Sequence, residues 1–564
     1  MRVFLAVSAR PHRREALIGA VRQAEEAAGA AIPVSPERVR GFSWARAGVH
    51  VLAWSNEPGW EPRIGPGGIT VTSGHHPGEP GPAPAYAQPG CFALLRADEH
   101  GLAASTSIAP ADPVYFAETP DLIVVGNRAL LVRLAAHGGV RYDVTALQSI
   151  ARQGYFLSEE TPFEGVRALP PASLLEAGDR LRVTTQPLTA GRGRTGAAKV
   201  AERMLSAVSP LRGQKPVRVT LTGGRDSRLI AALLHGAGIP FSASTSGFDD
   251  HPDVVVARRV AAALGVEHEV TRPVTQAGDL SVLHPADRVQ HVLRVCEGML
   301  SAYENITADA PYSDVPRLGG HNGEILRGGY LSAMQEATPE AVRKRTQTLF
   351  LANRALFTES ANARAAELAW TSTGIHVPDH LYVRFRVGRW HAAARAAMLR
   401  QGTPVQPFLD NRVVAAALGL DPGVRRSERL VHKLIKTFAP PLAGVPLEGG
   451  DWRFRTEGVL ARWRRGAERR LSGEAPAKPF NWRAEPGPEL AEELARTITS
   501  CDRLGEIVRM EKVPALFDGG QLVKPAFVWQ LYTVATLLGT DLTVPAAAAR
   551  GRVTVPTKRP IMAS

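Results

Sequence analysis

The fold is decided by residues 217–233, which are VRVTLTGGRDSRLIAAL. Apolar and polar residues alternate from Val217 to Leu221, and this period of two predicts a buried strand. Apolar residues at helical spacing begin at Leu229, after the turn Thr222-Gly223-Gly224. The stretch therefore favours an α/β fold in which a buried strand turns directly into a helix.

The turn has the composition of an anion-binding loop. Gly223 and Gly224 permit backbone angles that a side chain would forbid, so successive N–H groups can converge on an anion at the start of the helix. Ser227 adds a hydroxyl donor. The carboxylate of Asp226 would repel a phosphate, and we expect it to face a Mg²⁺ that bridges it to phosphate oxygens. The expected ligand is a nucleoside triphosphate with its metal, and the alternative is an ordinary glycine turn.

The composition is that of a globular protein. The chain has 564 residues, of which 44% are hydrophobic and 21% charged, which suits two or three domains. No apolar run reaches the length of a membrane span, and the apolar residues 3–7 are interrupted too soon for a signal peptide. We therefore expect a cytoplasmic protein without a membrane partner. Cys91, Cys296 and Cys501 lie too far apart to indicate a disulfide framework or a zinc site.

The net charge of +13 raises the question of a nucleic-acid partner. The basic residues are spread along the chain, and they form no block interleaved with aromatic residues. The charge pattern therefore does not favour nucleic acid as a partner.

Composition shifts divide the chain into three expected domains. Residues 1–190 are rich in short apolar strands, with a long Pro- and Gly-rich loop at 57–90 and a helix that Asp143 or Thr145 caps. Polar residues near 189–196 are typical of a linker. Residues 197–470 alternate helices with short strands, which favours a parallel sheet, and residues 471–564 form a helical extension.

Several motifs together resemble a known family. The T-G-G-x-D-S at 222–227 is similar to the S-G-G-x-D-S pyrophosphate-binding loop of ATP pyrophosphatases. Together with residues 90–93, 125–130 and 163–171, the chain resembles the glutamine-dependent asparagine synthetase superfamily, which includes β-lactam synthetases and lasso-peptide cyclases. The resemblance implies an αββα sandwich of the N-terminal-nucleophile (Ntn) hydrolase type, followed by a parallel-sheet ATP-pyrophosphatase (PP-loop) domain.

The first of these domains departs from the family pattern. The family's glutaminase uses a Cys directly after the initiator Met, whereas this chain has Arg2 and no Cys before Cys91. A thiolate nucleophile is thus missing at that position. We expect the fold to be kept and the glutaminase activity to be lost.

A second loop carries the rest of the expected site. Residues 318–330, LGGHNGEILRGGY, resemble the family's S-G-E-G-S-D-E-x-x-G-G-Y, and the match implies that Glu324 and Asp226 together hold Mg²⁺. A solvated Glu in a loop is the alternative. With the resemblance included, the expected nucleotide-binding residues are Leu221, Thr222, Gly223, Gly224, Asp226, Ser227, Ser246, Gly320 and Lys433.

Lys433 has a competing interpretation. It lies in an expected helix at 427–438 with Arg429 and Lys436, and these three residues equally fit a solvated basic face. A third family-like stretch, 403–412, is expected to contribute core residues, with Asp410 in a structural role.

Two residues are candidates for the acyl-transfer step. His321 lies where asparagine synthetases have a Glu and β-lactam synthetases a Tyr, and its near-neutral pKa suits a general base. The family's partner Lys is missing from residues 447–454, LEGGDWRF. Arg453 is the candidate for the missing positive charge, although a guanidinium cannot act as a base.

The sequence predicts an ATP-dependent amide ligase that adenylates a carboxylate, releases pyrophosphate and passes the acyl group to an amine. Without a glutaminase, the amine is expected on the substrate itself, as in a lasso-peptide cyclase, or to be ammonia. The expected partners are a small molecule or peptide that carries both groups, with a precursor peptide and other biosynthetic proteins. The alternatives are an ammonia-using asparagine synthetase, a tRNA-modifying PP-loop enzyme and a non-catalytic binding relative.

Overall fold

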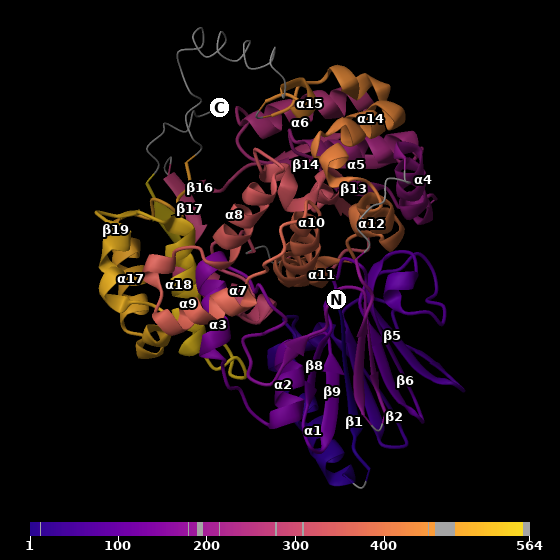
Figure 1. The fold of residues 1–564 in the computed structure, drawn as a ribbon, viewed down its shortest axis with the longest axis vertical. Helices are drawn as coiled ribbons and strands as arrows, with labels where there is room; N and C mark the ends of the chain where they lie inside the picture. Colours follow the sequence, from indigo (N-terminus) through magenta and orange to yellow (C-terminus); the bar gives the residue numbers. More distant parts are fainter. Residues whose placement is uncertain are drawn as a thin grey trace.

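The computed structural model describes residues 1–11, 13–178, 180–188, 196–213, 215–276, 279–306, 310–448, 450–456 and 480–556. The protein is of mixed α/β type, with antiparallel sheets near the N-terminus and a parallel sheet at the opposite end of the molecule (Figure 1). The predicted α/β class is therefore confirmed.

Two six-stranded antiparallel sheets form the N-terminal part. Their inner faces enclose a core to which Phe4 and Val51 contribute from one sheet and Val71 and Leu95 from the other. The first sheet has the order β10 (Arg167–Ala168), β8 (Tyr115–Glu118), β9 (Leu122–Gly126), β1 (Arg2–Ala9), β3 (Val49–Ser55) and β2 (Arg40–Arg46). The second has the order β12 (Leu181–Thr185), β11 (Ser173–Ala177), β7 (Gly101–Ser105), β6 (Cys91–Asp98), β5 (Gly68–His75) and β4 (Arg63–Gly65).

In the part of the chain that the structure describes, helices cover the outer face of the first sheet only. Alternation in β1 turns Val3, Leu5 and Val7 away from the inter-sheet core and toward α1 (Arg14–Ala31) and α2 (Ala129–His137). On the second sheet, the expected helical layer is replaced at β6 by the segment around η2 (Ala85–Ala87). That segment is too rich in Pro and Gly to form a helix.

The parallel sheet has the order β15 (His268–Thr271), β14 (Phe241–Ser246), β13 (Val217–Thr220) and β18 (Arg317–Gly319). Val219 of β13 pairs with Ala243 on one side and Leu318 on the other, and all neighbours are parallel. The helices of this region are α4 (Ala197–Val208), α5 (Arg225–Gly236), α6 (Pro252–Leu264) and α14 (Arg429–Phe438). The strand predicted at 217–221 and the helix predicted at 427–438 are confirmed, with bounds that differ by up to two residues.

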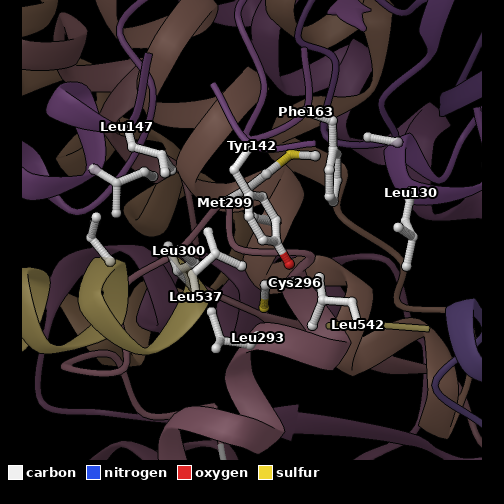
Figure 2. Close-up of a cluster of buried hydrophobic side chains, with 14 of the residues drawn as sticks. Leu130, Tyr142, Leu147, Phe163, Leu293, Cys296, Met299, Leu300, Leu537 and Leu542 are labelled. Atoms are coloured by element: carbon white, nitrogen blue, oxygen red, sulfur yellow. The ribbon is translucent and has the colours of Figure 1, made fainter. Parts of the chain in front are cut away.

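One core joins the beginning, middle and end of the chain. Figure 2 shows Leu147 of α3 (Val144–Gln153), Leu293 of α7 (Pro285–Cys296) and Leu537 of α18 (Pro525–Leu538) in a single buried cluster. The α3 helix begins where Asp143 accepts a hydrogen bond from the Ala146 N–H, as one of the two predicted caps. The divisions at 190–197 and 470–471 lie largely outside the described residues and stay predictions.

The remaining helices connect these parts. In the described residues, no helix is long and apolar enough to span a membrane. The other helices of five or more residues that bear on the site or its surroundings are α8 (Pro339–Phe350), α9 (Glu359–Leu368), α10 (Val377–Leu381), the π-helix η7 (Tyr382–His391), α11 (Ala392–Gln401), α12 (Asn411–Leu418), α13 (Pro422–Arg426) and α17 (Pro488–Thr499).

Candidate functional site

The loop between β13 and α5 lies at the carboxyl edge of the parallel sheet, where such sheets bind ligands. The Thr222 N–H donates to Ser227 Oγ at 3.0 Å, so the Ser227 hydroxyl closes the loop. The Gly223 N–H donates to Asp253 Oδ1 at 2.7 Å. The carboxylate oxygen of Asp253 thus already accepts a hydrogen bond from one of the backbone N–H groups predicted to bind phosphate.

The two glycines of this loop are needed for space rather than for unusual backbone angles. Gly224 has φ −75°, and neither glycine adopts the left-handed conformation. A Cβ added to Gly223 would lie 2.4 Å from Glu448 Cβ, so this position requires a glycine because of close packing. The predicted reason for the glycine pair was therefore wrong, although the loop lies where it was expected.

The second loop packs directly against the first. After β18, the chain passes through Gly320 into the short 3-10 helix η4 (Gly323–Arg327). A Cβ on Gly320 would lie 2.3 Å from the Ser227 backbone N, and one on Gly323 would lie 2.3 Å from Asp226 Cγ. This contact brings the carboxylate of Glu324 to the same side as that of Asp226.

Both carboxylates face Arg327. The guanidinium donates to Asp226 through Nε at 3.1 Å and through Nη2 at 2.6 Å, and Nη2 lies 3.7 Å from Glu324 Oε1. Burial raises the pKa of the Asp226 carboxyl, Arg327 opposes this, and the carboxylate of Glu324 adds to it. Burial lowers the pKa of Arg327, but the carboxylates around it outweigh burial and raise it overall. Asp226 and Glu324 therefore share one electrostatic environment.

Glu428, directly before α14, is a third carboxylate of this environment. It is 5% exposed and has a left-handed backbone with φ 64°, which is unusual for a residue with a side chain. Its Oε2 accepts hydrogen bonds from Arg225 Nε at 3.0 Å and from the Arg453 N–H at 2.9 Å. Its Oε1 lies 3.8 Å from Arg327 Nη1.

Tyr382 fixes the orientation of Glu324. Tyr382 lies at the start of η7, and its hydroxyl donates to Glu324 Oε2 at 2.8 Å. Burial raises the pKa of the Tyr382 phenol, and the neighbouring Glu324 carboxylate raises it further. The phenol therefore stays protonated and keeps its hydrogen bond.

His321 is the candidate base, and it lies beside this cluster. Its side chain is exposed on one side, and on the other its ring centre lies 5.8 Å from the ring centre of the buried His391. Desolvation lowers the pKa of His321, Glu324 opposes this, and Arg386 lowers it further. Its neutral form, which can accept a proton, is thus the prevalent form at pH 7.

The side chains of three other predicted residues, Arg453, Lys433 and Ser246, contact backbone or face solvent. The Arg453 guanidinium donates to the carbonyl oxygens of Ser332 and Met334, and its role as the charge of the site stays a prediction. Lys433 is exposed on α14, and Ser246 is exposed at the end of β14.

The sequence reasoning missed Arg327, Glu428, Tyr382 and Asp253. Arg327 could have been found, because it follows Glu324 by three residues in the second motif and a short helix places such residues on one side. Asp253 ends a His-Pro-Asp segment that resembles the family's S-P-D, whereas Glu428 and Tyr382 carry no comparable signal, because tertiary packing alone brings them to the loops.

Asp226 and Glu324 are oxygen donors of the kind that Mg²⁺ prefers, and their common neighbour Arg327 shows that they face one point. Across the described residues, no group of three or more His, Cys, Asp or Glu side chains is arranged to hold a metal. A Mg²⁺ at this point would therefore need phosphate or water oxygens to complete its six ligands. The two carboxylates fit a metal that arrives with a nucleotide.

Residues 199–439 match the family model of asparagine synthase. This part of the chain is therefore similar to the asparagine synthase family. Members of the family are ATP-dependent ligases that form C–N bonds. The matched segment contains both loops and all three carboxylates described above.

Comparison with solved structures finds weaker similarity. The chain is similar to the allosteric regulatory enzyme of purine biosynthesis at 9% identity, over 48% of this chain and 80% of that one, with a TM-score of 0.22. It is also similar to glutamine phosphoribosylpyrophosphate amidotransferase from B. subtilis in complex with ADP and GMP. The identity is 8% over 59% of this chain and 76% of that one, with a TM-score of 0.21. These scores carry no argument about fold or function. No curated protein matches the chain.

Proposed function

We propose that the protein is an ATP-dependent ligase that adenylates a substrate carboxylate and transfers the acyl group to an amine. The observation that carries this proposal is the approach of Asp226 and Glu324 across two loops at the carboxyl edge of the parallel sheet. In this proposal residues 197–470 form the ATP-pyrophosphatase domain and residues 1–190 an Ntn-hydrolase-like domain.

The loop 221–227 would hold the pyrophosphate portion of ATP through the Ser227 hydroxyl and the backbone N–H groups at the start of α5, because the N–H groups of Thr222, Gly223 and Gly224 already donate within the protein. Asp226 and Glu324 would hold Mg²⁺, which supplies positive charge to the phosphate oxygens. A substrate carboxylate oxygen attacks the α-phosphorus and pyrophosphate leaves. The amine then attacks the acyl carbon, AMP leaves, and His321 accepts the proton that the amine loses.

The N-terminal part supports an amine other than one released from glutamine. Arg2 lies in β1 and its guanidinium pairs with Glu57 at 2.7 Å, so this position carries a structural ion pair. Cys91 is buried, and burial raises the pKa of its thiol to about 12, which makes it a poor nucleophile. We propose an amine on the substrate itself, as in lasso-peptide cyclisation, and ammonia as the second candidate.

The test is isotope exchange between pyrophosphate and ATP, measured with candidate acids and with precursor peptides encoded near the gene. Exchange that depends on a peptide, followed by loss of one water from its mass, supports cyclisation. Exchange with aspartate and formation of asparagine from ammonia would support the simple synthetase instead. Salt-dependent tRNA binding without exchange would favour a tRNA-modifying enzyme. Absence of exchange even with the true substrate would favour a non-catalytic binding role.

A Gly320→Ala variant is expected to bind a non-hydrolysable ATP analogue about tenfold more weakly. The added Cβ would lie 2.3 Å from the Ser227 backbone N, so the two loops must separate. Calorimetric titration measures the change. The matched control is Gly444→Ala, whose Cβ meets nothing within 4 Å, and equal affinities for the two variants would contradict the packing argument.

A His321→Ala variant is expected to keep pyrophosphate exchange but to form amide about 100-fold more slowly, because only the second step needs a base. Desolvation lowers the pKa of His321 while Glu324 and Arg386 act on it in opposite directions, so the acid limb of the wild-type pH profile should fall below pH 6.5. The variant should lack that limb. Unchanged amide formation would remove His321 from the mechanism.

A further inference from the structure

The clearest feature that the proposed function leaves unexplained is Arg327. Its guanidinium engages both oxygens of Asp226, at 3.1 Å and 2.6 Å, and lies close to Glu324. These are the same two carboxylates that would hold the metal. Mg²⁺ needs ligand oxygens at about 2.0–2.1 Å in octahedral geometry. It therefore competes for the Asp226 oxygens with a guanidinium that donates a hydrogen bond to each of them.

We infer that Arg327 is an internal competitor of the divalent cation: it pairs with Asp226 when the metal is absent and moves to Glu428 when the metal binds. The inference rests on the proposed function, because it concerns the regulation of the same site. It makes occupancy of the site depend on the free concentration of the divalent cation together with the nucleotide.

The geometry provides a place for the displaced guanidinium. Glu428 Oε2 is engaged by Arg225 and by the Arg453 N–H, but Oε1 is turned toward Arg327 Nη1, at 3.8 Å. A small rotation of the side chain shortens this distance to that of a hydrogen bond. Displacement therefore exchanges one carboxylate partner for another and leaves no buried charge unpaired.

Surrounding contacts keep the carboxylates of Glu324 and Glu428 in place during this exchange. Tyr382 holds Glu324 through a hydrogen bond of 2.8 Å, and Glu428 is fixed by two donors on its other oxygen. The side chains of Arg327 and Asp226 are each 15% exposed, so their ion pair is shielded from water and is stronger than a surface pair. Arg327 is the one member of this group that the exchange requires to move.

The test measures the binding of Mn²⁺ to the full-length protein in the presence of α,β-methylene ATP. The concentration of free Mn²⁺ is read from its electron paramagnetic resonance signal. An Arg327→Met variant is expected to bind Mn²⁺ about tenfold more tightly than the wild type. A Glu428→Gln variant is expected to bind it more weakly, because the displaced guanidinium loses its second partner. Arg327→Lys, which keeps the charge but not the two-point contact, should fall between wild type and Arg327→Met.

The matched control is Arg2→Met, which removes a similarly shielded guanidinium that donates two hydrogen bonds to Glu57 and lies outside both loops of the site. Its Mn²⁺ affinity should stay within about threefold of the wild type, a change below the tenfold step of about 1.4 kcal/mol. Equal affinity of wild type and Arg327→Met, or an equal gain in Arg2→Met, would overturn the inference alone. Absence of Mn²⁺ binding in every protein would overturn the metal site of the proposed function as well. Thermal unfolding of each variant shows that the comparison is between folded proteins.

Discussion

Replacement of Asp226 by Asn should lower the rate of pyrophosphate exchange by about 100-fold or more. Asp226 is in the first turn of α5, beside the loop that would hold the phosphates, and the only carboxylate close to it in the second loop is Glu324. An amide keeps the shape of the side chain but loses the charge that attracts a metal. The rate is measured at saturating ATP and at several Mg²⁺ concentrations.

The control for this prediction is Asp249→Asn. Asp249 is an exposed carboxylate that pairs with Arg258 and Arg272, and it lies after β14 on another loop. This variant should exchange pyrophosphate at nearly the wild-type rate. If Asp226→Asn stays within a few fold of the wild type as well, the carboxylate does not hold the metal and the proposed site is wrong.

Replacement of Asp379 by Ala should destabilise the protein by about 3–5 kcal/mol. Asp379 pairs with Arg425 through two hydrogen bonds, and their side chains are 3% and 0% exposed. Removal of the carboxylate leaves a guanidinium buried without a counter-charge. Because Arg425 also donates to the Ile325 carbonyl at 2.7 Å, the loop that carries Glu324 should lose its support.

Thermal unfolding followed by far-UV circular dichroism should show a midpoint lower by about 3–4 °C for Asp379→Ala, because the entropy of unfolding scales with the length of the chain. The double variant Asp379→Ala with Arg425→Met removes both charges and should recover part of the loss. A double variant less stable than Asp379→Ala would contradict the explanation by an unpaired charge.

The sequence was sufficient to predict the central strands and helices. The alternation at 217–221 and the helical spacing after it are local patterns, and β13 and α5 follow them closely. The third family-like stretch behaved as expected, since Phe408 and Leu409 are fully buried and Asp410 caps α12 through the Arg412 N–H. Patterns of this kind depend only on neighbouring residues.

The electrostatics of the site could not be predicted in the same way. Nothing near Glu428 in the sequence indicates that its carboxylate meets Arg225 and Arg327, because more than 100 residues separate it from the nearer of the two. Arg453 was expected to supply charge, and backbone carbonyl oxygens engage its guanidinium. Which guanidinium reaches a carboxylate depends on how the loops stack, and a single sequence does not state this.

The buried cluster of Figure 2 has a consequence for experiments on fragments. Its side chains come from α3, α7 and α18, which fall in three different predicted domains. A ligase fragment cut out at residues 197 and 470 would present the apolar side of α7 to water, and such surfaces promote aggregation. The N-terminal part therefore serves as a permanent support that covers the apolar side of α7 in the intact protein.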